Sequence, residues 1–221
     1  MARGKFITFE GGEGAGKSTQ VRLLADHLSA AGHSVLVTRE PGGSLFAETI
    51  RRVVLDTATP AHSLLCEALL FNAARADHLE TTIRPALDRG RWVICDRFID
   101  STRAYQGEVG GLDPETLNAL DGIVVRPTMP DLTIVIDLDP VVGLARVEQR
   151  RMGGPAGAAA PIDRFESRST DFHEQLRTAY LKIARAEPVR CVVVNGFQSV
   201  DKLARDIRGH IDARLLSRGQ R

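Results

Sequence analysis

The stretch from Gly11 to Ser18 has the residue types and spacing best suited to chemistry. It reads Gly-Gly-Glu-Gly-Ala-Gly-Lys-Ser, the spacing of a phosphate-binding P-loop. Such a loop meets phosphate oxygens with backbone N–H groups, a lysine cation and a hydroxyl that reaches Mg²⁺. The residues expected to bind a nucleoside triphosphate are Gly11, Gly12, Glu13, Gly14, Ala15, Gly16, Lys17, Ser18 and Thr19.

The segments on either side favour a P-loop over an ordinary glycine-rich turn. An apolar run precedes the loop at residues 6–10, and residues 19–31 have the apolar spacing of a helix. The N-terminus of that helix would point at the bound anion and stabilise it.

A second group of polar residues follows the run at residues 92–96. Asp96 can orient the water shell of a metal ion, and Arg97 can bind an acceptor phosphate through two N–H groups. The hydroxyl of Ser18 and the carboxylate of Asp96 are therefore the candidate metal ligands.

An aromatic residue and a cation lie one helical turn apart at Phe71 and Arg75. Phe71 can stack on a nucleotide base, and Arg75 can donate to a carbonyl on its edge. The alternatives are a core aromatic side chain for Phe71 and a solvated surface charge for Arg75.

The composition is that of a globular α/β protein. The 221 residues are 43% hydrophobic and 26% charged with a net charge of +1, so no global basic field attracts nucleic acid. No signal peptide or membrane span is recognisable, and a cytoplasmic location is expected. Cys66, Cys95 and Cys191 lie in apolar runs and are expected to be buried thiols.

Apolar β-branched runs alternate with helical patterns along the whole chain. Continuous apolar runs without period-two alternation are typical of strands buried on both faces, so we expect a doubly wound, five-stranded parallel sheet flanked by helices in a single domain, residues 1–221. The expected strands are residues 6–10, 35–38, 92–96, 132–137 and 191–195, and the expected helices include residues 45–55, 64–74, 117–120, 141–147, 176–186 and 203–215.

One segment, residues 152–161, breaks this composition because it holds only small, uncharged residues after Met152. Arg150, Arg151 and Arg164 flank it. It is either a mobile surface loop or a lid, about residues 150–164, that carries arginines onto a phosphate ligand.

Several blocks of sequence resemble the thymidylate kinase family. They are FEGGEGAGKSTQ, TREPGGS, LLFNAARADHLE, DRFIDSTRAYQG, PDLTIVIDLDP and DRFE, and the resemblance runs from about Lys5 to about Leu215. One departure is Arg103, where the family often has a small residue or an uncharged amide. This position is expected to touch either solvent or the rim of the base pocket.

The resemblance implies phosphorylation of dTMP to dTDP by a P-loop kinase that uses ATP and Mg²⁺. Glu13 would approach the dTMP sugar, and Tyr105 would pack under the deoxyribose. The family also reads adenine through a loop after the last strand, here near residues 195–199. The implied dTMP ligands are Glu13, Arg39, Arg51, Phe71, Arg75, Arg97, Ser101, Tyr105 and Gln106, and the implied catalytic residues are Lys17, Asp96, Arg97, Arg150, Arg151 and Arg164.

The P-loop has no basic residue before Lys17, so the chain resembles the family members whose lid supplies the arginines. The resemblance also implies a homodimer. The net charge of +1 and the lack of a membrane span predict no nucleic acid or membrane partner. A kinase for another nucleoside monophosphate is the nearest alternative. A GTP-driven switch would need an N-K-x-D motif, which the sequence lacks, and a non-catalytic nucleotide-binding module would not need Lys17, Ser18 and Asp96 together.

Overall fold

A computed structural model, which describes residues 3–152 and 164–216, contains the expected parallel sheet. The strand order is β2-β3-β1-β4-β5, and every neighbouring pair is parallel. The predicted α/β fold is therefore confirmed. The strands are β1 (Phe6–Glu10), β2 (Val35–Arg39), β3 (Trp92–Asp96), β4 (Leu132–Asp137) and β5 (Cys191–Asn195).

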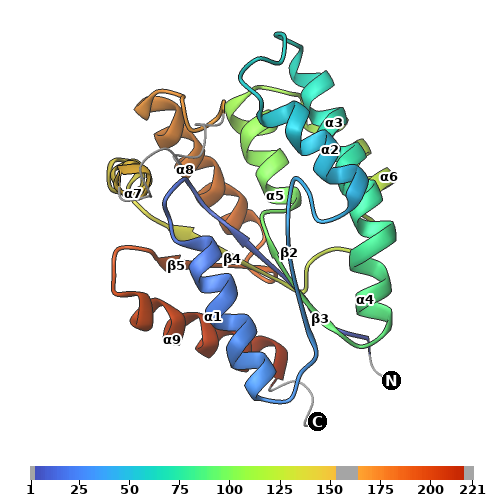
Figure 1. The fold of residues 1–221 in the computed structure, drawn as a ribbon, viewed down its shortest axis with the longest axis vertical. Coiled ribbons are helices and arrows are strands. Elements are labelled where there is room, and N and C mark those ends of the chain that lie inside the picture. Colours follow the sequence, from blue (N-terminus) through green and yellow to red (C-terminus); the bar gives the residue numbers. More distant parts are fainter. Residues whose placement is uncertain (1–2, 153–163, 217–221) are drawn as a thin grey trace.

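Helices cover both faces of the sheet (Figure 1). On one face α1 and α9 pack together and against the strands, and on the other α4 and α8 contact β3, β4 and β5. The helices are α1 (Lys17–Ala30), α2 (Leu45–Leu55), α3 (Leu64–His78), α4 (Arg84–Asp88), α5 (Ile99–Thr102), α6 (Pro114–Val124), α7 (Pro140–Met152), α8 (Thr170–Ala186) and α9 (Val200–Ile211), with π-helical stretches η1 (Leu79–Ile83), η2 (Arg103–Val109) and η3 (Asp212–Leu216).

The side chains of β1 alternate between the two faces of the sheet and so belong to two separate core clusters. Ile7 and Phe9 pack into the cluster under α1 and α9, whereas Phe6 packs into the cluster on the opposite face. Because side chains alternate along a strand, Glu10 shares the side of Phe6 and lies in the interior with 0% exposure. A carboxylate is thus buried at the end of β1 next to the P-loop.

Short polar side chains begin many of the helices. A serine or aspartate at the N-cap accepts a hydrogen bond from the backbone N–H three residues later, which satisfies one of the unpaired donors of the first turn. The residues with this geometry are Ser44, Ser63, Asp113, Ser169 and Ser199.

A buried ion-pair network anchors α5 behind the sheet. Arg190 donates to both carboxylate oxygens of Asp100 at 2.7 and 2.9 Å. Arg103 donates to Asp121 at 3.0 Å and to Glu187 at 2.6 Å. The Arg103 guanidinium points into this network, and Arg103 is not among the residues that line the base end of the cavity.

The structure also corrects other expectations from the sequence. Helices α6, α8 and α9 begin three or more residues earlier than their apolar spacing indicated, and α4, α5, η1 and η2 were not predicted. Cys66 is exposed and not buried, because it lies on the outward side of α3, whereas Cys95 and Cys191 are buried. Within the described residues no helix is long and apolar enough to cross a membrane.

Candidate active site

The P-loop joins β1 to α1 through a backbone that requires glycine. Gly11, Gly14 and Gly16 have φ values of 137°, 66° and 96°, a region that side chains rarely adopt. A Cβ on Gly14 would also collide with the backbone oxygen of Gly143 in α7. The motif glycines Gly11 and Gly16 are therefore needed for the turn, and Gly14 is needed for the turn and for the close approach of α7.

Lys17 opens α1 at the floor of the site. Its ammonium donates to the backbone oxygens of Gly11 and Gly12 at 3.0 and 2.8 Å. Burial lowers the pKa of Lys17 and the nearby charge of Arg97 lowers it further, whereas Glu13 and Asp96 oppose the shift. The cation is thus held in a low-dielectric position from which it can reach a phosphate.

Ser18 and Asp96 lie together at the meeting point of α1 and β3. The Ser18 hydroxyl donates to the Asp96 carboxylate at 2.7 Å. Both groups offer the hard oxygen ligands that Mg²⁺ prefers. The described residues contain no cluster of three or more His, Cys, Asp or Glu that could hold a metal ion by itself. Ser18 and Asp96 are thus the two residues here that would hold a Mg²⁺ ion.

Arg97 follows β3 in a strained backbone conformation. Its φ is 69°, the left-handed region that is costly for a residue with a Cβ. The Arg97 N–H donates to the oxygen of Phe9 at 2.9 Å, and the next N–H, of Phe98, donates to the buried Glu10 carboxylate at 2.8 Å. The two bonds pin the backbone on both sides of the Arg97 side chain.

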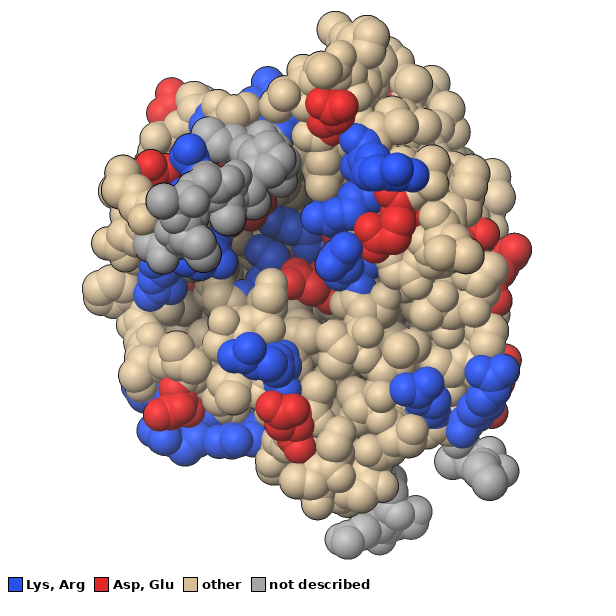
Figure 2. All heavy atoms as spheres, in the orientation of Figure 1, with Lys and Arg blue, Asp and Glu red and all other residues tan. Residues whose placement is uncertain are grey.

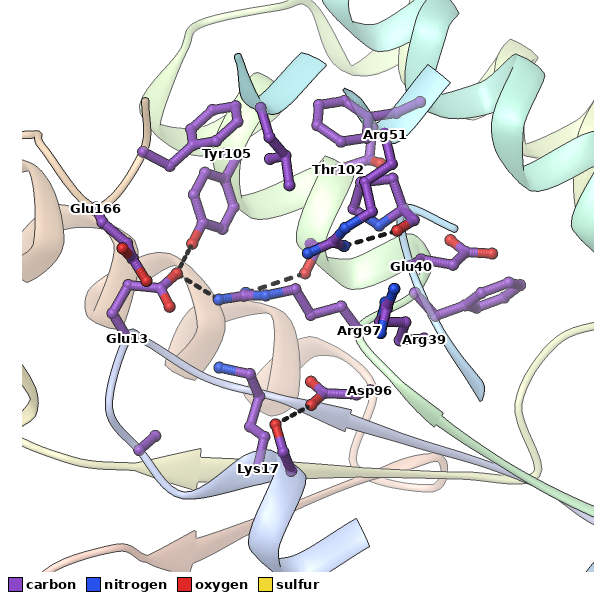
Figure 3. Close-up of a pocket in the computed structure, with 18 of the residues that line it drawn as sticks. Glu13, Lys17, Arg39, Glu40, Arg51, Asp96, Arg97, Thr102, Tyr105 and Glu166 are labelled. Carbon is purple, nitrogen blue, oxygen red and sulfur yellow. Dashed lines mark hydrogen bonds and ion pairs between the residues drawn. The ribbon is translucent and has the colours of Figure 1, made fainter. Parts of the chain in front are cut away.

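The Arg97 guanidinium is the centre of the site's hydrogen bonds. It donates to Glu13 Oε1 at 2.5 Å, to the hydroxyl of Tyr180 at 3.0 Å and to Ser101 Oγ at 3.4 Å. Tyr105 also donates to Glu13 Oε1, at 3.0 Å. Figure 3 shows Arg97 and Tyr105 converging on the Glu13 carboxylate from different sides of the pocket.

The two carboxylates near Arg97 differ in their pKa shifts. Burial raises the pKa of Glu13, but the charges of Arg97 and Lys17 and the hydrogen bond from Tyr105 outweigh it and lower the value to about 2. Burial and the charge of Asp100 raise the pKa of Glu10 to about 7, against the opposing charge of Arg97. Glu13 is thus held ionised, whereas the pKa of Glu10 lies close to neutral pH.

A cavity of about 400 Å³ opens above these residues, and Figure 2 shows basic side chains along its walls. It brings together most of the residues that the sequence singled out. The predicted residues that line it are Glu13, Gly14, Ala15, Gly16, Lys17, Ser18, Thr19, Arg39, Arg51, Phe71, Arg75, Asp96, Arg97, Ser101, Tyr105, Gln106 and Arg150.

At the far end of the cavity, Arg75 is almost fully engaged by the protein. It donates to Glu40 at 2.7 Å, to the Phe98 oxygen and Thr102 hydroxyl at 3.2 and 3.0 Å, and to Asn72 at 3.4 Å. Among the described residues these bonds leave an N–H of Nη1 for another acceptor. Arg75 can therefore offer a donor to a base only from a rigid position.

The other two predicted phosphate ligands lie on the rim. Arg39 pairs with Glu48 at 3.1 Å and is exposed. Arg51 donates to the backbone oxygen of Pro41 at 2.7 Å, which aims its guanidinium across the cavity (Figure 3). Both side chains remain within reach of an anion that enters from solvent.

The three arginines predicted for the lid occupy different environments. Arg150 lies in the last turn of α7 and lines the cavity, whereas Arg151 pairs with Glu148 in the same helix at 2.6 Å. Arg164 pairs with Glu67 of α3 at 2.7 Å. Residues 153–163 of the predicted lid lie outside the described residues, and neither Arg151 nor Arg164 is among the residues that line the cavity.

A second hollow of about 480 Å³ lies on the other side of the P-loop. Its wall includes Gly196 and Gln198, from the loop after β5 that the resemblance associates with adenine. Arg150 lines this hollow as well as the first cavity. The two spaces therefore adjoin across the P-loop, with one arginine at both.

The sequence did not reveal several residues that hydrogen-bond to the predicted site residues. Glu40 and Thr102 lie beside predicted residues and could have been included with them, and Glu10 is marked by a carboxylate at the end of an apolar strand. Glu67 lies one helical turn before Phe71 in the predicted helix, which could have marked it. Tyr180 carries no local signal, because only the packing of α8 brings its hydroxyl to Arg97. These residues are Glu10, Glu40, Glu67, Thr102 and Tyr180.

Comparison with known proteins gives a consistent result. The family model described as thymidylate kinase matches residues 9–207. A thymidylate kinase of Caulobacter vibrioides is 52% identical over 97% of this chain and 99% of its own length, and one of Nitrobacter hamburgensis is 48% identical over 98% and 91%. A crystal structure of thymidylate kinase from Ehrlichia chaffeensis superimposes with a TM-score of 0.74 at 32% identity, over 95% of this chain and 99% of that one.

The lowered pKa of Glu13 predicts a specific dependence of stability on pH. Its folded pKa of about 2 lies below the ordinary value of 4.5, so its contribution is present above 4.5 and is lost as pH falls toward 2. The difference in free energy of unfolding between the wild type and Glu13→Gln, measured with urea, should therefore shrink by about 2 kcal/mol from pH 7 to pH 3. A difference that is the same at both pH values would contradict the ionised, paired state of Glu13.

Proposed function

Because this chain belongs to the thymidylate kinase family, it phosphorylates dTMP, and we propose that its two adjoining cavities hold dTMP and ATP on either side of the P-loop. The observation that carries this assignment is the Arg97 guanidinium, fixed at the end of β3 and facing the P-loop across the cavity. It provides a donor fork for the dTMP phosphate next to the lysine that reaches ATP.

In this proposal the dTMP molecule extends from the P-loop toward α3. Its phosphate lies among Arg39, Arg51 and Arg97, and its sugar contacts Tyr105 and Glu13. Its base lies at the far end of the cavity, against Phe71 and within reach of Arg75, Ser101 and Gln106. All nine of these residues line the one cavity, which supports the assignment.

ATP then lies along the other side of the P-loop. The backbone N–H groups of residues 11–19 and the N-terminus of α1 bind its phosphates, and Lys17 neutralises their charge. The second hollow, with Gly196 and Gln198 in its wall, provides space for the adenosine. Ser18 and Asp96 would hold Mg²⁺, which when bound screens the charge of the phosphates.

The transfer itself needs little from protein acids or bases. The attacking group is a dTMP phosphate oxygen that is already ionised at neutral pH, so no general base is required. The protein must align the two phosphates, supply positive charge and keep water away. Lys17 and Arg97 meet the first two needs from fixed positions.

Arg150 is the predicted lid arginine best placed to act on the transferred group. It lines both the dTMP cavity and the ATP cavity, so its guanidinium can reach the space between the two phosphates. Arg151 and Arg164 remain candidates that would have to leave Glu148 and Glu67 to do so.

We also infer a cytoplasmic homodimer. Helices α2 and α3 pack side by side and expose apolar side chains to solvent, among them Phe46, Leu65 and Leu69. Burial of such a face against a second copy would remove that surface from water. The free thiols of Cys66, Cys95 and Cys191 suit a reducing compartment.

Replacement of Lys17 by Met should abolish phosphoryl transfer without unfolding the protein. The ammonium bonds only to P-loop oxygens among the described residues, so the core does not depend on it. The measurement is ADP release with dTMP, dUMP, dCMP or dGMP as acceptor, together with thermal unfolding. Lys182→Met, at an exposed ion pair with Glu108, is the matched control and should keep full activity. Normal turnover by Lys17→Met would contradict the assignment of the P-loop to ATP.

Replacement of Arg150 by Ala should lower kcat more than replacement of Arg151 by Ala. An arginine that stabilises the charge on the transferred phosphoryl group contributes about 10³-fold or more in rate. Steady-state kinetics of the two variants should show the loss in kcat, with a smaller change in the KM for ATP. Equal and unimpaired kcat values would show that α7 supplies no catalytic charge.

A further inference from the structure

Glu67 joins two parts of the site through its two carboxylate oxygens. Oε1 accepts a hydrogen bond from the side-chain amide of Gln106 at 2.8 Å. Oε2 accepts one from the Arg164 guanidinium at 2.7 Å, with the ring of His62 3.5 Å away. Glu67 and Gln106 are only 6% and 2% exposed, so water cannot readily replace these bonds.

The chemistry of this contact fixes which way the Gln106 amide faces. A carboxylate accepts hydrogen bonds and donates none, whereas a glutamine amide has a donating NH₂ end and an accepting oxygen end. Gln106 must therefore turn its NH₂ toward Glu67. Its carbonyl oxygen then faces away from Glu67, and no described residue donates a side-chain hydrogen bond to it.

This orientation matters because Gln106 lines the base end of the dTMP cavity. Thymine and uracil present an N3–H donor between two carbonyl groups. Cytosine presents an unprotonated N3 acceptor beside an amino group. A glutamine oxygen that faces the base matches the first pattern and opposes the second, since two acceptors repel and leave each other unsatisfied.

We propose that Glu67 is a specificity-determining positioning residue, which selects bases with an N3–H by holding the Gln106 amide oxygen toward them. The inference rests on the proposed position of the base beside Gln106. Arg164 contributes by occupying the other oxygen of Glu67, so that neither oxygen is free to rotate away.

Replacement of Glu67 by Gln tests this proposal directly, because Arg164 determines which way the new amide faces. Arg164 can only donate, so the new amide must turn its oxygen toward Arg164 and its NH₂ toward Gln106. Gln106 must then reverse, with its oxygen toward residue 67 and its NH₂ toward the base. The donor presented to the base would now suit the N3 of cytosine and oppose the N3–H of thymine.

The measurement is kcat/KM for dTMP, dUMP and dCMP in the wild type and E67Q. The ratio of dTMP to dCMP should fall by at least about fivefold, the least that an unsatisfied buried group costs. The ratio of dTMP to dUMP should not change, because both bases carry the same N3–H. dCMP should remain a poor substrate, since Arg75 still offers a donor to its amino group.

Two further variants separate the possible outcomes. E67D keeps an acceptor-only group and should preserve the dTMP to dCMP ratio even if turnover falls. If E67Q changes both ratios equally, or leaves the dTMP to dCMP ratio unchanged, the proposal is overturned. Gln106→Leu tests the premise that the base lies beside Gln106. Unchanged kinetics of this variant with dTMP and dUMP would show that the base does not bind there. Impaired kinetics of Gln106→Leu, together with an unchanged dTMP to dCMP ratio in E67Q, would overturn only the role of Glu67.

Discussion

The position of the Arg97 guanidinium is the constraint on which the rest of the site depends. Its backbone is strained at φ 69°, so surrounding bonds must keep it there. They come from Phe9 and Glu10 of β1, which hold the backbone, and from Glu13 and Tyr180, which hold the side chain. Glu10 Oε2 also accepts a hydrogen bond from the Ser101 hydroxyl at 2.7 Å, and that hydroxyl lies 2.9 Å from the hydroxyl of Tyr180. The sheet, the P-loop and α8 thus share one network around one cation.

Other arginines of the cavity are also paired with carboxylates. Arg39 pairs with Glu48 and Arg75 with Glu40. The Arg75–Glu40 pair is buried and holds its arginine in a defined direction, whereas the exposed Arg39–Glu48 pair constrains Arg39 less. Side chains that are held in place need little reorganisation when a charged substrate binds. Preorganised charges favour transfer reactions for this reason. Glu67 follows the same principle with a neutral group, since it orients the amide of Gln106.

The sequence predicted what is encoded locally, and failed where distant segments meet. The P-loop and the five strands follow from motif spacing and from continuous apolar runs, and the observed bounds agree to within one residue. Helix α5 and η2 were missed because residues 99–109 mix polar side chains with glycine and lack a clear apolar period. Tyr180 lies 83 positions from Arg97 and Glu67 lies 39 from Gln106, so only the packing of α8 and α3 reveals those contacts. The prediction that Cys66 is buried failed because the apolar run around it forms a face of α3 that points outward.

The most direct test of this account is the affinity of Tyr180→Phe for dTMP, measured by calorimetry. The substitution keeps the buried ring and removes only the hydroxyl that accepts from Arg97. If the network positions Arg97 for the acceptor phosphate, dTMP should bind at least about tenfold more weakly, the lower range expected when a hydrogen bond to a charged group is lost. ATP binding and the unfolding temperature should change little. Unaltered affinity for dTMP would show that Tyr180 only fills space and that Arg97 needs no support from α8.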